Sequence, residues 1–132
     1  MLRRLSIRSE HGQAMVELAF VLPILIVVML GIAQFGVVFN NYVTMTDAAR
    51  AGARKAAVSR FTGDNGASAK ALVYADATSL DSSKLNVTVD SSDWTTAGSD
   101  VTVTATYPYD INLLGWVVQS GTLTTTTKER LE

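Results

Sequence analysis

The strongest hydrophobic pattern of the chain lies in its first half. No charged residue occurs between Glu17 and Asp47, a run of 29 positions. The most apolar part of this run, 18–39, contains a single polar side chain, Gln34. A helix over these 22 residues is about 33 Å long, which is enough to cross a hydrocarbon core of about 30 Å. The pattern therefore predicts a membrane-spanning helix over about 18–39.

Residues 47–60 favour continuation of this helix beyond the membrane. They contain six alanines, four basic residues and no proline, and alanine has the highest helix propensity. We therefore predict one N-terminal helix, 13–60, that ends near Ser59 and is about 65–70 Å long. Small residues recur at helical spacing, which indicates either a close-packing face or simple helix propensity: Ala48, Ala49, Gly52, Ala53, Ala56 and Ala57.

The remaining residues, 61–132, form a predicted α+β domain. Turn-forming residues from Phe61 to Gly66 end the long helix. Ser68 is a suitable N-cap for a short second helix from Ala69 to about Leu80.

Beyond the second helix the apolar residues alternate with polar ones, which is typical of strands with one buried face. The alternation covers 85–90 and 101–107, and a weaker, threonine-rich strand covers 122–130. We therefore expect the α+β class: a long N-terminal transmembrane helix, a short second helix and a three-stranded antiparallel sheet.

The charges before the apolar run predict the orientation of the helix. Arg3, Arg4 and Arg8, offset by Glu10, form a short basic end, and such ends stay in the cytoplasm. The chain is therefore expected to cross the inner membrane once, with its N-terminus cytoplasmic and 61–132 extracytoplasmic.

A cleavable secretory signal is the alternative. Gly31, Ile32 and Ala33 before Gln34 include the small residues that signal peptidase prefers. However, apolar residues continue past this point to Phe39, and a signal sequence has no use for a carboxylate such as Glu17 at the front of its apolar run.

Composition excludes several classes of chemistry. The net charge is −1, there is no cysteine, and His11 is the single histidine. Thiolate zinc sites, cysteine nucleophiles and most histidine-based acid–base pairs are therefore excluded. We expect no enzymatic activity, cofactor, metal site, small-molecule substrate or nucleic-acid partner, and we interpret Asp64-Asn65-Gly66 as a turn and not as a calcium loop.

The position of Glu17 suggests a processing event. If the chain is cut after Gly12, Gln13 becomes the N-terminus and Glu17 the fifth residue. The carboxylate then lies in the first helical turn, where the helix dipole favours negative charge, one turn from a new ammonium group. The alternative is that Glu17 lies solvated among lipid headgroups and only caps the helix.

The residues from Gly12 to Val58 resemble the TadE-like family, the minor pseudopilins of tight-adherence (Tad/Flp, type IVb) pilus systems. Four motifs typical of that family occur in order: a G-x-x-x-V-E-F/L start, a proline early in the apolar run, G-I-x-x-F-G and A-A-R-x-G-A-R. Here these are Gly12, Val16, Glu17 and Leu18; Pro23; Gly31, Ile32, Phe35 and Gly36; and Ala48, Ala49, Arg50, Gly52, Ala53 and Arg54.

The resemblance implies a function and a set of partners. Residues 1–12 would be a prepilin-type leader, removed between Gly12 and Gln13 by a membrane peptidase, and Glu17 would pair with the N-terminus of a neighbouring subunit. The chain would take part in assembling an adhesive pilus used in cell adhesion and biofilm formation, as a reduced type IV pilin. Its partners would be other pilins, the assembly platform, the peptidase and the lipid bilayer.

An apolar cluster in 108–121 is a candidate partner surface, and a lid on the domain's own core is the equal alternative. Its members are Ile111, Leu113, Leu114, Trp116, Val117 and Val118. Two other functional hypotheses also stand: a membrane-anchored periplasmic binding domain that never enters a filament, and a secreted protein released after Ala33.

Overall fold

The computed structural model describes residues 7–132, with side-chain burial from Gly12 onward. The first half of the predicted leader, 1–6, which includes Arg3 and Arg4, lies outside the described residues. The chain forms helix α1 (Ile7–Ala57), a 3-10 turn (Ser59–Phe61), helix α2 (Ala67–Asp76) and strands β1 (Asn86–Ser91), β2 (Asp100–Leu113) and β3 (Trp116–Arg130). The predicted α+β class, with its long and short helices and three-stranded antiparallel sheet, is confirmed.

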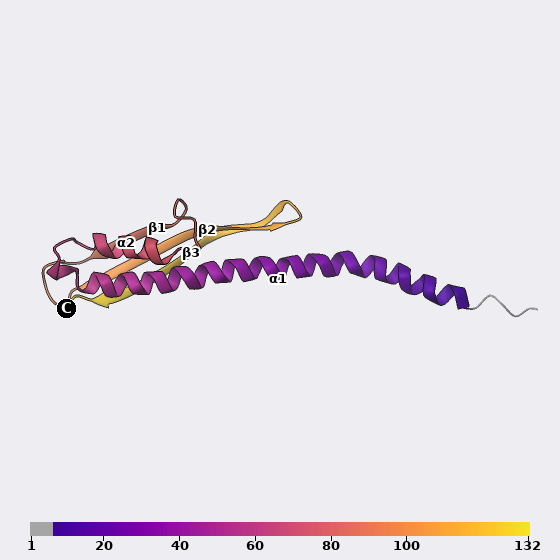
Figure 1. Ribbon diagram of the computed structural model, residues 1–132, viewed down its shortest axis with the longest axis horizontal. Helices are drawn as coiled ribbons and strands as arrows, with labels where there is room; N and C mark the ends of the chain where they lie inside the picture. Colours follow the sequence, from indigo (N-terminus) through magenta and orange to yellow (C-terminus); the bar gives the residue numbers. More distant parts are fainter. Residues whose placement is uncertain (1–6) are drawn as a thin grey trace, which may run out of the picture.

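Helix α1 extends far beyond the rest of the molecule (Figure 1). Its 51 residues continue through Pro23 without a break, which gives a length of about 76 Å at about 1.5 Å per residue. No residue in the most apolar part of the helix is buried in the isolated chain. The apolar run is therefore not the core helix of a soluble domain.

The C-terminal end of α1 is part of the domain core. Its small-residue face contacts α2 and the sheet, and the members of this face are almost completely buried: Ala48, Ala49, Ala53, Ala56 and Ala57. Gly52 lies so close to α2 that an added Cβ would overlap Cγ2 of Val73 and lie 3.3 Å from the carbonyl oxygen of Ala69. The small residues therefore serve close packing, and helix propensity alone does not explain them.

The sheet has the strand order β1-β2-β3 and is antiparallel throughout. One face is covered by the helices and carries the fully buried side chains of Val87, Val101, Val103 and Ala105. The opposite face carries exposed or half-buried threonines, of which Thr104 and Thr126 approach to 3.4 Å between their hydroxyl oxygens. The alternation of apolar and polar residues thus correctly predicted which face of the sheet is buried.

Two details of the prediction are wrong. Ser68 does not cap α2, because the helix begins at Ala67. The N-cap residue is Gly66, which has no side chain, and Asp64 supplies the acceptor instead: its carboxylate accepts hydrogen bonds from the backbone N–H groups of Gly66 and Ser68, at 3.2 and 3.0 Å. The second and third strands are also longer than predicted, since both continue into the apolar cluster and form one long hairpin.

The contact at Gly52 generates a stability prediction. Gly52→Ala should lower the free energy of unfolding by about 1–3 kcal/mol, because the added methyl group overpacks the contact with Val73. Unfolding of the full chain by urea in mild detergent measures the change. Gly36→Ala is the matched control, because a Cβ there meets no atom within 4 Å. Equal stabilities of the two variants would contradict the packing role of Gly52.

Two turn carboxylates generate a pH prediction. Hydrogen bonds from Ser68, Thr62 and Gly66 lower the pKa of Asp64 from 3.8 to about 2. Hydrogen bonds from Thr95 and Thr96 in the β1–β2 loop lower the pKa of Asp93 from 3.8 to about 2. Because the folded-state pKa values are depressed, both groups stabilise the fold above pH 3.8, and this stabilisation is lost as the pH falls towards 2.

The thermal unfolding midpoint should therefore fall over that acidic range, and Asp64→Asn or Asp93→Asn should make the fall smaller. Circular dichroism at stepped pH measures it. If both variants keep the full wild-type pH dependence, the two carboxylates do not contribute to it.

Candidate membrane helix and hairpin surface

The predicted processing residues lie near the beginning of α1. Gly12, Gln13 and Glu17 are all exposed, and a Cβ at Gly12 would meet no atom within 4 Å. Gln13 and Glu17 are four positions apart in one helix, so they lie on the same face, one turn from each other. A new amino group at Gln13 would therefore be within one helical turn of the Glu17 carboxylate.

Large apolar side chains cover every side of α1 between Glu17 and Asn40. Most of them are exposed, from 38% at Leu30 to 74% at Phe20, whereas Val38 is half-buried. A helix that is apolar all round belongs in a protein core or a membrane, and within the described chain only the β2–β3 hairpin approaches this segment, on one side near Gly31 and Val38. The fold thus leaves a membrane, or other protein chains, as the environment for this surface.

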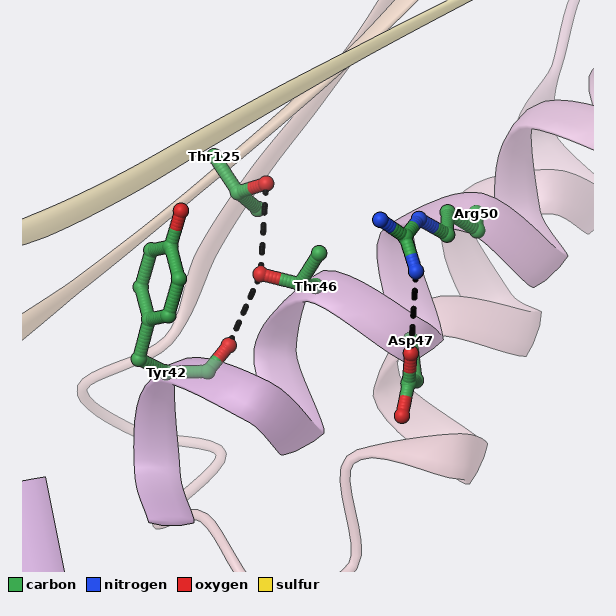
Figure 2. A network of polar contacts seen from close by, with 5 residues as sticks. All are labelled: Tyr42, Thr46, Asp47, Arg50 and Thr125. Atoms are coloured by element: carbon green, nitrogen blue, oxygen red, sulfur yellow. Dashed lines mark hydrogen bonds and ion pairs between the residues drawn. The ribbon is translucent and has the colours of Figure 1, made fainter. Parts of the chain in front are cut away.

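Polar contacts occur where α1 packs against β3 beyond the uncharged run (Figure 2). The hydroxyl of Thr46 donates to the carbonyl oxygen of Tyr42 at 2.8 Å and lies 3.5 Å from the hydroxyl of Thr125 on β3. Asp47, the first charged residue after the apolar run, forms an exposed ion pair with Arg50 at 3.5 Å. An exposed pair of this kind adds little stability, but it marks the return of the helix to a polar environment.

The β2–β3 hairpin extends along α1, away from the rest of the sheet (Figure 1). Its two-residue turn, Leu114-Gly115, has φ values of +53° and +89°, and Leu113 pairs with Trp116. Two successive positive φ angles are typical of a type I′ turn, which favours asparagine or glycine at the first position. Leucine therefore occupies a position that its side chain disfavours.

A cleft of about 470 Å³ separates the hairpin from α1. No carboxylate, lysine, arginine or histidine lines it, so its environment is suited to apolar contact and offers no acid–base chemistry. The lining residues include Gly31, Phe35 and Val38 of α1 and Tyr109, Ile111, Leu113 and Val118 of the hairpin.

The candidate partner residues divide into two groups. Ile111 is 7% exposed and Leu113 is half-buried, and both side chains line the cleft. Leu114, Trp116 and Val117 are 73%, 81% and 59% exposed at the end of the hairpin. Ile111 is therefore part of the domain's own packing, and the accessible surface consists of the residues at and after the turn.

The sequence did not reveal that these residues form the end of a long hairpin. The usual Asn-Gly or Asp-Gly turn signal is absent because Leu114 precedes Gly115. Another feature of the sequence does mark this region as one unit: no charged residue occurs between Asp110 and Lys128. This uncharged run covers the end of β2, the turn and most of β3.

The fold defines a class of protein: a small α+β domain that carries a long, unpartnered apolar helix at its N-terminal side. The family model described as TadE-like protein matches residues 12–54. Over this segment, about a third of the chain, the sequence is similar to the TadE-like family, in agreement with the resemblance that the motifs between Gly12 and Val58 indicated. The comparisons with curated proteins and with solved structures found no match.

The match covers the predicted cleavage site, Glu17, the apolar run and most of the small-residue face of α1. Helix α2 and the sheet, including the β2–β3 hairpin, lie outside it. The matched segment therefore comprises the candidate membrane span of α1 and most of the face that packs against the domain.

Proposed function

We propose that the chain is a minor pseudopilin that takes part in assembling an adhesive Tad/Flp-type pilus, with a structural and not a catalytic role. The supporting observation is the TadE-like match over 12–54 on a helix whose apolar surface is left largely exposed by the described chain. Such a helix can be covered by lipid before assembly and by the helices of other subunits afterwards.

The helix would hold the subunit in the inner membrane until assembly. The basic residues Arg3, Arg4 and Arg8 favour a cytoplasmic N-terminus, and the domain would then lie outside. Because the end of α1 is buried in the domain core, a force on the domain is transmitted directly to the helix. A subunit of this kind can be lifted from the membrane as one body.

Cleavage after Gly12 would create the charge that Glu17 needs. An unpaired carboxylate in apolar surroundings either protonates or is excluded from them. An ammonium group at Gln13 of a neighbouring subunit would stabilise the ionised form and favour one axial register between helices. The exposure of Gln13 and Glu17 on one face of α1 supports this role.

The proposed cleavage is tested with Gly12→Val in cells that contain the peptidase. The larger side chain should block cleavage, so that the protein keeps its first 12 residues. Intact-mass measurement of membrane protein distinguishes the two forms. Gly36→Val, at another open position of α1, should be processed normally. Normal removal of the leader from Gly12→Val would contradict a peptidase site at this glycine.

The proposed register role is tested with Glu17→Gln. Insertion into the membrane should remain intact, because the change removes only a charge. Pilus assembly should fall at least about tenfold, since removing one partner of a buried ion pair costs about 3–5 kcal/mol. Pili sheared from the cells and quantified by immunoblot provide the readout. Glu129→Gln makes the same change on exposed β3, and a wild-type pilus yield from both variants would refute the role.

A further inference from the structure

The end of the β2–β3 hairpin has the character of a surface that contacts lipid. Residues 111–127 carry no charge on either strand. Trp116, Val117 and Val118 are 81%, 59% and 62% exposed after the turn. Leu114, 73% exposed, occupies a turn position with φ of +53° that asparagine or glycine would fill with less strain. The apolar side chain of Leu114 is therefore not explained by the requirements of the turn.

The hairpin end lies beside the part of α1 that enters the membrane. Leu113 and Val118 share the cleft with Gly31 and Phe35, and Figure 1 shows the hairpin running along the helix. Gly31 lies within the uncharged run of α1. The uncharged end of the hairpin and the uncharged segment of α1 therefore lie side by side at the same position along the helix axis.

The free edges of the hairpin limit how deeply it can enter a bilayer. Strand β1 pairs with β2 only as far as Thr106, so β2 from Tyr107 to Leu113 is bonded to β3 alone. The outer edge of β3 has no strand partner in the described sheet. Unpaired backbone groups of an open sheet edge are not tolerated in hydrocarbon. The hairpin end can reach the interfacial layer, where tryptophan is favoured, but it cannot pass into the core.

We propose that the hairpin end rests in the extracytoplasmic interface of the bilayer that α1 spans and sets the depth of the helix. The proposal rests on the membrane insertion of α1 put forward above. The proposal places the outer limit of the hydrocarbon core near Gly31 and Ile32. The segment of α1 that crosses the core is then 13–32, about 20 residues, and not the segment 18–39 that hydrophobicity alone predicts.

This depth has a consequence for Glu17. Gly31 follows Glu17 by fourteen positions, which corresponds to about 21 Å along the helix. In a core of about 30 Å, the carboxylate would then lie about 9 Å inside the cytoplasmic boundary. The hairpin therefore holds Glu17 in hydrocarbon, where it needs a positively charged partner.

The two tryptophans of the chain provide the test. The full chain is reconstituted in phosphatidylcholine vesicles whose acyl chains are brominated either near the headgroup or near the chain end. The fluorescence of the Trp116→Phe variant gives the quenching of Trp94, which is half-buried in the domain. The difference in fluorescence between wild type and this variant gives the quenching of Trp116. Because Trp116 is exposed, the substitution leaves the fold intact.

Bromine near the headgroup should quench Trp116 several-fold more strongly than bromine near the chain end, and Trp94 should be unaffected by both. Equal, negligible quenching of the two tryptophans would overturn the proposal. Shielding of Trp116 that increases with the protein-to-lipid ratio would also overturn it, because a second copy of the chain would then be the partner.

Two further variants, made in the Trp116→Phe background, measure the depth of α1. Leu22→Trp lies near the middle of 13–32, and Met29→Trp lies near the middle of 18–39. The proposal expects deep bromine to quench Leu22→Trp most. Strongest deep quenching of Met29→Trp would overturn the depth-setting role while leaving membrane insertion in place. Absence of quenching at both positions would instead show that α1 does not span the bilayer and would refute the anchoring in the proposed function.

Discussion

The close packing of the C-terminal end of α1 against α2 and the sheet is the contact on which the rest of the structure depends. The alanine face of the helix lets its backbone approach the domain, and the absence of a side chain at Gly52 admits Val73. Because of this contact, the domain has a core although α2 and the sheet are small. It also makes the apolar helix and the domain one body, so that the position of one in a membrane or a filament determines the position of the other.

The distribution of charge along this body indicates how it is oriented in its surroundings. Charged side chains are absent from α1 between Glu17 and Asp47 and from the hairpin between Asp110 and Lys128. The structure places these two segments next to each other, with only apolar and uncharged groups around the cleft that separates them. The remaining charges of residues 12–132 lie on the domain side, with the exception of Glu17.

Periodicity in the sequence was sufficient to predict the elements that bury a regular face. The uncharged run predicted α1, and the alternation around Val87 and Val103 predicted the buried side of the sheet.

Features that depend on tertiary contacts could not be predicted in this way. The role of the small residues was undecided because alanine favours a helix with or without a partner. The end of the hairpin was missed because Leu114 replaces the usual turn residue, and the cap of α2 was misassigned because the carboxylate of Asp64 reaches forward to Ser68. For the candidate site, the spacing of Gly12 and Glu17 was readable from the chain, whereas the division of the apolar cluster between cleft and surface was not.

The central claim is that Glu17 is tolerated in apolar surroundings because cleavage of the chain supplies an amino group at the matching position. Intact-mass measurement of the protein purified from the membranes of its native cells tests this claim most directly. The account predicts a mature chain that begins at Gln13. A chain that still begins at Met1 would leave the carboxylate without its partner and reduce the protein to an anchored domain, and a chain that begins at Gln34 would make the apolar run a secretory signal.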